Sequence, residues 1–189
     1  MDEMVLLRRA SSEFGRRLTS VTPDQLSRPS PCEKWTVRDL IKHVVGESIT
    51  SVRLLHRADA EEATVGLDRD ILRGDPSAAF ATATSAEFEA FEERGAAERI
   101  VYHPAMDMAG AQLLGFRIGG LTLHAWDLAR GVGGDETLDT ELVEAVWAQL
   151  APMAPFIAQT GVFGVGPSGE VGEDAPLQVR LLDLSGRRP

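Results

Sequence analysis

The feature that most constrains the fold is a series of four long segments with apolar residues at helical spacing. Apolar side chains that recur every three or four residues form one face of a helix, and that face must be buried against another element. Because such helices follow one another along the chain, we predict an all-α, antiparallel four-helix bundle. The four segments cover residues 2–18, 36–58, 76–94 and 108–131.

The boundaries of these segments carry capping signals. Thr36 can accept a hydrogen bond from the backbone of Asp39, whose side chain can return it, which is the pattern of a capping box. Asp75 comes directly before a proline, as an N-cap does before a proline in the first turn. We expect Asp107 to cap the fourth long helix and the glycines around Gly133 to end it.

The rest of the chain is predicted to be accessory to the bundle. Residues 58–75 are expected to form an exposed connection, and residues 98–104 an extended segment. An extra helix is expected from Thr140 to about Ala158, with prolines interrupting its end, and an irregular C-terminal tail follows. Because 189 residues fit one domain and we find no internal repeat, we expect a single domain over residues 1–189.

Charge and hydropathy exclude several classes of function. The chain has 19 Lys and Arg against 29 Asp and Glu, so its net charge is −10. Nucleic-acid-binding proteins usually carry a basic stripe, and we therefore expect no nucleic acid and no anionic membrane as partners. The N-terminal residues lack the apolar core of a signal peptide, which favours a cytoplasmic location. Cys32, the one cysteine, cannot form a disulfide within the chain.

Two of the four histidines lie in the middle of predicted helices, among apolar residues. His43 is in the second long segment and has Glu47 one turn later. His124 is in the fourth, with Gly120 one turn earlier and Asp127 three residues later. Two helices of a bundle can each point a histidine into a shared cleft. A divalent metal could therefore find two imidazoles and a carboxylate between these helices.

A purely structural interpretation stays open for each of these residues. On spacing alone the favoured one is that both histidines are core residues bonded to backbone carbonyls, because the chain has no HxxxH or HExxH pattern. Asp127 could orient a ligating histidine from outside the metal's ligands, or it could cap a helix. Trp126 could line a pocket or pack in the core. Cys32 could be a stabilised thiolate before a helix or a small packing residue.

Three blocks of sequence together resemble one family. They are RPSPCEKWTVRDLIKHVVGES at residues 28–48, LHAWDLARGVG at residues 123–133 and RLLDLSGRRP at residues 180–189. These blocks are similar to PCxxWTVRDLxxHxxG, HxWDLAxAxG and RLLAxxGRxP, the patterns of the mycothiol-dependent maleylpyruvate isomerase N-terminal domain family within the DinB-like superfamily. The last block resembles an actinobacterial subgroup. Because the blocks occur in order over nearly the whole chain, they are more specific than any single motif.

The resemblance implies a DinB-like four-helix bundle with a metal site between its helices. His43 and His124 match two of the family's ligand positions, while the third position falls on Gly120, which has no side chain. Glu47 could replace the missing ligand, or water and substrate could complete the coordination. The resemblance also implies a divalent metal, with zinc favoured over nickel, and mycothiol as a co-substrate.

Three hypotheses on function follow. The first is an enzyme in which a metal activates a low-molecular-weight thiol for transfer or isomerisation on a small molecule; the resemblance does not imply activity on maleylpyruvate itself. The second is a non-catalytic small-molecule-binding or scaffold protein whose metal site is degenerate at Gly120. The third is a structural bundle that forms a homodimer. Whether the chain is an enzyme at all stays open between them.

Overall fold

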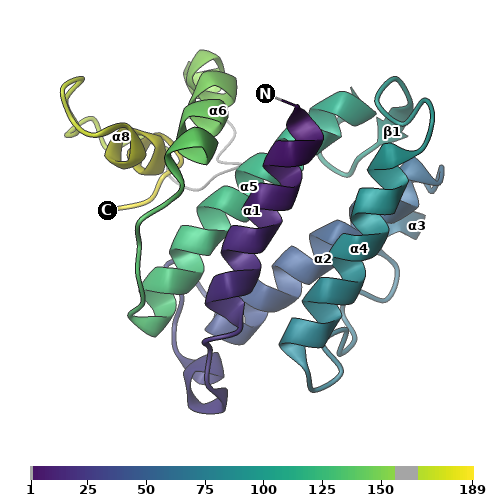
Figure 1. The fold of residues 1–189 in the computed structure, drawn as a ribbon, viewed down its shortest axis with the longest axis horizontal. Coiled ribbons are helices and arrows are strands. Elements are labelled where there is room, and N and C mark those ends of the chain that lie inside the picture. Colours follow the sequence, from purple (N-terminus) through teal and green to yellow (C-terminus); the bar gives the residue numbers. More distant parts are fainter. Residues whose placement is uncertain (1, 156–165) are drawn as a thin grey trace. The chain divides into compact units, whose positions relative to one another are not determined.

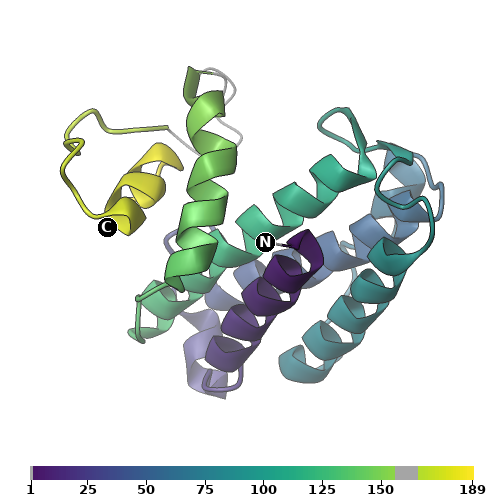
Figure 2. The same ribbon diagram turned by 45° about the horizontal axis from the view of Figure 1, so that its top comes forward.

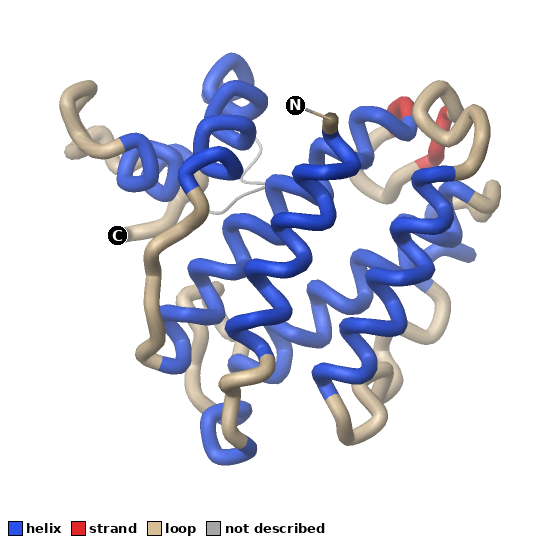
Figure 3. The backbone as a smooth tube through the Cα atoms, in the orientation of Figure 1, coloured by secondary structure: helices blue, strands red, loops and turns tan. Residues whose placement is uncertain are grey.

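The computed structural model describes residues 2–155 and 166–189. The chain divides into two compact units, Met1–Glu136 and Thr137–Pro189. Both are helical, and in the described residues the strands form one small two-stranded sheet (Figure 3). The single domain expected over residues 1–189 stays a prediction.

The first unit is the predicted helical bundle. Helix α1 packs against α4 and α5, and α2 packs against the same two helices, so that the four surround a common core (Figures 1 and 2). Two short elements, η1 and α3, lie in the connections. The elements are α1 (Glu3–Leu18), η1 (Pro23–Ser27), α2 (Val37–Leu55), α3 (Ala60–Thr64), α4 (Pro76–Glu92) and α5 (Gly110–Val132).

Two helices of the bundle run in each direction. The end of α2 meets the end of α4, where His56 Nε2 lies 3.0 Å from Glu93 Oε1, so these two helices run the same way. The start of α1 meets the end of α4 through Arg8 and Glu92, so α1 runs the opposite way. Because α2 and α4 run the same way, the connection between them must run back along the bundle. We expected this connection, residues 58–75, to be exposed, but its Leu72 is buried.

Most of the predicted helix boundaries are confirmed. Thr36 Oγ1 accepts from the backbone N–H of Asp39 at 3.2 Å, and the Asp39 carboxylate accepts from the N–H of Thr36 at 3.0 Å. The Asp75 side chain accepts from the backbone of Ala78 at the start of α4. Helix α5 ends at Gly133, whose φ of 73° is in the left-handed region that favours glycine.

The cap predicted at Asp107 is wrong, because Asp107 begins a strand. Strand β1 (Ile100–Tyr102) pairs antiparallel with β2 (Asp107–Ala109), so the expected extended segment is one arm of a hairpin. Helix α5 starts only at Gly110, where an added Cβ would lie 1.9 Å from the carbonyl oxygen of Ala96. The backbone passes so closely at this point that only glycine fits.

The second unit holds α6 (Thr140–Leu150), η2 (Ala151–Met153) and α8 (Leu177–Leu184). Helix α6 ends before Pro152, as the prolines predict, and the last residues of the predicted fifth helix, 156–158, lie outside the described residues. The tail expected to be irregular contains α8. No helix in the described parts of the chain is both long and apolar enough to span a membrane.

The core of the first unit is mostly apolar. Large buried side chains come from all four helices, and burying each contributes roughly 1.5–3 kcal/mol. They include Leu7 and Phe14 of α1, Leu40, Ile41 and Leu54 of α2, Phe80 of α4, and Leu121, Trp126 and Leu128 of α5. The buried charged side chains of this unit are Arg17 on α1, Glu87 on α4, and Arg117 and Asp127 on α5. The last three surround the candidate site.

Candidate functional site

The structure brings the two candidate histidines together. Helices α2 and α5 run in opposite directions, and the rings of His43 and His124 meet edge to face with centroids 5.1 Å apart. Trp35, in the segment before α2, lies against both, with its ring 4.6 Å from His43 and 6.5 Å from His124. Both histidines stay partly exposed, with 33% and 13% of their side chains accessible.

Glu47 joins the histidines because it lies one turn after His43 on the same face of α2. His43, Glu47 and His124 each offer one ligand atom, and these three atoms all lie within 4.8 Å of one another. His43 Nε2 is 3.4 Å from Glu47 Oε1. Two donors bound at about 2.0–2.1 Å to one tetrahedral ion stand about 3.4 Å apart. The donor set and its spacing therefore fit a divalent metal such as zinc.

Asp127 contacts His124 from the side away from this cluster's ligand atoms. Its buried carboxylate lies 2.9 Å from His124 Nδ1, which therefore carries the proton when the ring is neutral and leaves Nε2 as the ligand atom. A carboxylate that holds the far nitrogen is the usual support of a ligating histidine. The Cys32 thiol donates to the same oxygen, Asp127 Oδ2, at 3.4 Å. Cys32, His124 and Asp127 also form a second group of ligand atoms within 4.8 Å.

A buried network of charges lies behind Glu47. Arg117 Nη1 donates to Glu47 Oε2 at 2.5 Å, and Arg117 Nε donates to Glu87 Oε1 at 2.6 Å. Arg117 Nη2 donates to Ser48 Oγ at 3.1 Å, and Ser48 in turn donates to Glu87 Oε2 at 3.0 Å. The network therefore connects α2, α4 and α5, and it reaches the site through one oxygen of Glu47.

This network sets the charge state of Glu47. Desolvation by itself would raise the pKa of Glu47, but the charge of Arg117 and the contact with His43 outweigh it, so the pKa lies well below its ordinary value. Burial would likewise lower the pKa of Arg117, but Glu87 and Glu47 outweigh it and raise that pKa. Glu47 is therefore a carboxylate, and Arg117 a cation, at neutral pH.

Gly120 and Trp126 have different surroundings. Gly120 lies on α5 facing Glu47, and a Cβ added there would stand 3.4 Å from Glu47 Oε2. Trp126 is buried in the core, and the guanidinium of Arg130 lies 4.4 Å from its ring centroid. The aromatic ring against the histidines is that of Trp35. A pocket role for Trp126 stays a prediction.

Sequence reasoning missed the residues that hold Glu47. Arg117 lies between Phe116 and Ile118 in an apolar stretch of α5, and a lone charge in such a stretch is the signal that could have found it. Glu87 is fully buried on α4, but Glu89 and Glu92 follow it closely, so its sequence context carries no such signal. Neither position indicates its partner, because the two lie 30 residues apart.

A third histidine lies within electrostatic reach of the site. Burial lowers the pKa of His103, with Arg117 acting in the same direction and Glu47 against it. His103 Nδ1 accepts from the backbone N–H of Ala105 at 3.1 Å, so its neutral ring carries the proton on Nε2. The turn of the β-hairpin is thus close enough for the charges of Glu47 and Arg117 to affect the pKa of His103.

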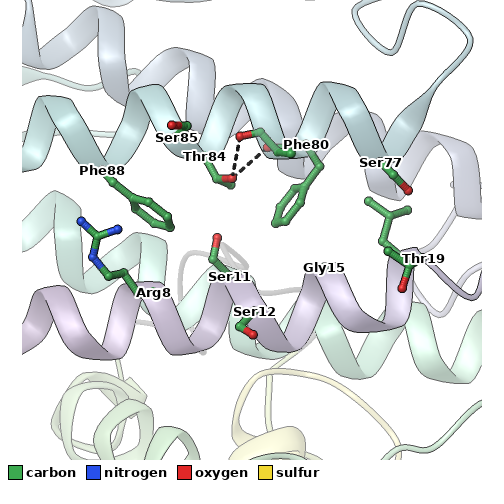
Figure 4. Close-up of a pocket in the computed structure, with 12 residues that line it drawn as sticks. Arg8, Ser11, Ser12, Gly15, Thr19, Ser77, Phe80, Thr84, Ser85 and Phe88 are labelled. Atoms are coloured by element: carbon green, nitrogen blue, oxygen red, sulfur yellow. Dashed lines mark hydrogen bonds between the residues drawn. The ribbon is translucent and has the colours of Figure 1, made fainter.

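The structure also has a groove that contains none of these residues. The α1–α4 groove, about 410 Å³ in volume, is lined by apolar and hydroxyl side chains of those two helices (Figure 4). Phe80 and Phe88 face it from α4, where the Thr84 hydroxyl donates to the Phe80 carbonyl at 2.9 Å. Ser11 faces it from α1, and its buried hydroxyl has no hydrogen-bond partner among the described residues.

The fold and the site together define the class of protein: an all-α bundle with a cluster of two histidines and a carboxylate between two antiparallel helices. Residues 7–129 match the family model of the mycothiol maleylpyruvate isomerase N-terminal domain, and the chain belongs to this family. The expected family is thereby confirmed.

Relatives in sequence and in structure agree with this assignment. Two uncharacterised proteins of Mycobacterium tuberculosis, from strains CDC 1551 / Oshkosh and ATCC 25618 / H37Rv, are each 33% identical over 156 residues, which is 82% of this chain and 81% of theirs. The crystal structures of a mycothiol-dependent maleylpyruvate isomerase and of its histidine-to-alanine mutant superpose with TM-scores of 0.62 and 0.64. They are 20% and 19% identical, and the match covers 80% of this chain and 68% of each of theirs. This likeness shows the DinB-like fold.

Proposed function

We propose that the chain binds a divalent metal through His43, Glu47 and His124 and uses it to activate a low-molecular-weight thiol. The observation that carries the proposal is the convergence of these three ligand atoms within 4.8 Å. Two histidines and a glutamate are a donor set of catalytic zinc sites, which keep a further position open. The thiol would then be transferred to a small molecule, or would promote its isomerisation.

The residues around the cluster suit this chemistry. When bound, the metal would act as a Lewis acid that lowers the pKa of a thiol, so that a thiolate nucleophile is available at neutral pH. Two neutral imidazoles and one carboxylate leave a net positive charge on a divalent ion, which favours an incoming thiolate. Asp127 holds the tautomer of His124 that presents Nε2, and Trp35 limits access of water along one side of the two rings.

The family supports mycothiol as the thiol, because mycothiol is part of the family's name. Zinc is the favoured metal, since it accepts nitrogen, oxygen and sulfur ligands together, and nickel is the alternative. The proposal includes a cytoplasmic location, where thiols are kept reduced. A homodimer stays a prediction that a mass measurement in solution would test.

Metal analysis tests the proposal directly. Protein purified without chelator and then loaded with Zn²⁺ should retain about one ion per chain after gel filtration. His43→Ala and His124→Ala should each lower that content sharply, while Trp147→Phe in the second unit should leave it unchanged. The proposal fails if the unaltered protein retains neither Zn²⁺ nor Ni²⁺ after loading.

Binding of the thiol provides the second half of the test. Adding mycothiol to the zinc-loaded protein should increase the ultraviolet absorption of the thiolate at pH 7, because the metal lowers the thiol pKa. The His124→Ala variant should show no such increase. An absence of thiolate formation with stoichiometric zinc in place would leave the metal site but remove the thiol from the proposal.

A second candidate function is a non-catalytic binding protein with a degenerate metal site. Gly120, which offers no ligand atom one turn before His124, is the observation that favours it. This candidate predicts that the unaltered protein binds Zn²⁺ weakly and that Gly120→Glu, by supplying a carboxylate from α5, strengthens binding at least tenfold. Zinc titrations of the two proteins side by side distinguish the candidates.

A further inference from the structure

The two oxygens of Glu47 have different surroundings. Oε2 accepts from Arg117 Nη1 at 2.5 Å, while Oε1 stands 3.4 Å from His43 Nε2. One oxygen is therefore bound by a buried cation, and the other faces the histidines. A glutamate side chain that is held in this way has already lost the rotamer freedom that costs up to about 2 kcal/mol when it is fixed.

The cation itself has little freedom to move. Arg117 is almost completely buried, and its guanidinium donates in three directions, to Glu47, Glu87 and Ser48. Glu87 is fully buried and receives a second hydrogen bond from Ser48. Because a guanidinium is planar and its donors are fixed relative to each other, the contact with Glu87 determines where Nη1 points.

Gly120 of α5 lies beside the contact between Glu47 and Arg117. An added Cβ would stand 3.4 Å from Glu47 Oε2 and 3.8 Å from Arg117 Nη1. A longer side chain at this position would extend into the space that the carboxylate and guanidinium already occupy. The turn of α5 before His124 therefore offers no ligand of its own but gives room to a carboxylate from α2.

We propose that Arg117, fixed by Glu87, is a positioning residue that directs the Glu47 carboxylate to the two histidines, and that Gly120 provides the space for it. The carboxylate of this site thus comes from α2, and its orientation is set by a charge pair between α4 and α5. This inference rests on the metal site of the proposed function. It differs from a merely structural network in one respect: disrupting the pair must change metal binding and not only stability.

The test is a set of Zn²⁺ titrations of the full chain against a competing chelator. The first variant is Arg117→Met with Glu87→Met, which removes both buried charges together and so leaves no lone buried carboxylate. We expect its affinity for Zn²⁺ to fall by 10- to 100-fold, the usual loss when a support of a ligand is removed. Arg117→Lys is the second variant, because it keeps the positive charge but loses the planar guanidinium with its fixed donors. Its affinity for Zn²⁺ should fall at least fivefold.

A transfer of the carboxylate tests the role of Gly120. Glu47→Ala should lower the affinity for Zn²⁺ by at least 100-fold. Adding Gly120→Glu to that variant should raise the affinity at least tenfold again, because the space beside Gly120 is then free. Gly120→Glu with Glu47 intact should not strengthen binding. The visible spectrum of bound Co²⁺ should change in Arg117→Lys, which shows an altered ligand geometry that a stability effect alone would not produce.

Each result has a defined meaning. If His43→Ala abolishes Zn²⁺ binding while Glu47→Ala binds as the unaltered protein does, the metal site stands and this inference is overturned. The inference is also overturned if Arg117→Lys, shown by circular dichroism to be folded, keeps full affinity for Zn²⁺ and an unchanged Co²⁺ spectrum. If the unaltered protein and the Glu47→Ala/Gly120→Glu variant both bind no Zn²⁺, the proposed function and this inference fall together.

Discussion

The histidine site, made of His43, Glu47, His124 and the groups bonded to them, differs from the α1–α4 groove in how its polar atoms are used. In the site, Arg117 and Asp127 are buried, and each has partners at hydrogen-bond distance. In the groove, Arg8 pairs with Glu92 in the open, with about half of each side chain exposed. A bundle needs apolar packing between its helices, and either interface provides that. Only the site adds a polar arrangement that fixes particular atoms in place, which is what a binding centre requires.

Removing one charge from each region should give the largest contrast. Arg117→Met leaves Glu87 buried without its cation, and breaking a buried pair in this way costs about 3–5 kcal/mol of unfolding free energy. Arg8→Met at the rim of the groove breaks an exposed pair, which is worth at most about 1 kcal/mol. Urea denaturation of both variants measures the two losses. Equal losses would mean that the buried network stabilises the fold no more than the exposed pair does.

Asp127→Asn should affect the metal more than the fold. The amide keeps the shape of the side chain but loses the charge that holds the His124 ring, so Zn²⁺ affinity should fall by about 10- to 100-fold. Glu92→Gln, in the exposed pair with Arg8, is the matched control, because it makes the same kind of change away from the histidines. Competition titrations that give both variants the same affinity would remove Asp127 from the site.

Much of the fold follows from local sequence signals. The capping box at Thr36, the cap at Asp75 and the left-handed glycine at Gly133 are each formed by residues close in the chain, so the sequence predicted them correctly. The predicted cap at Asp107 failed because the segment pairs with β1 instead. Asp107 is paired with Tyr102, five residues earlier, and this strand pairing takes the place of the expected helix cap.

The site was only half predictable for the same reason. His43 and Glu47 share a helix face, so their proximity follows from spacing alone, and family blocks indicated His124 as their partner. The pairing of Arg117 with Glu87 depends instead on how α4 and α5 pack. No local pattern encodes that contact. The position of Trp35 beside the histidines likewise depends on the path of the chain before α2.

The same small substitution should have opposite effects in the two regions. Ser48→Ala removes a hydroxyl that links Arg117 to Glu87, and we expect a loss of about 1–3 kcal/mol because both buried charges lose a partner. Ser11→Ala removes a buried hydroxyl that has no partner among the described residues, so stability should stay the same or rise by up to about 1 kcal/mol. Thermal and urea unfolding measure both. A clear loss in Ser11→Ala would show that this hydroxyl is bonded in solution.

The smallest effect should come from a charge pair on α1, away from the histidines. Glu13 accepts from Arg16 at 3.2 Å and also from Arg17. Burial would raise the pKa of Glu13, but these two cations outweigh it and lower the pKa below its ordinary value of 4.5. A carboxyl whose pKa is lower in the folded state adds stability above pH 4.5, and that contribution disappears as the pH falls through the folded-state pKa. Glu13→Gln should therefore cost about 0.5 kcal/mol at pH 7 and progressively less as the pH falls through the folded-state pKa, without changing Zn²⁺ affinity. A cost that persists unchanged at low pH would mean that Glu13 contributes by packing and not by its charge.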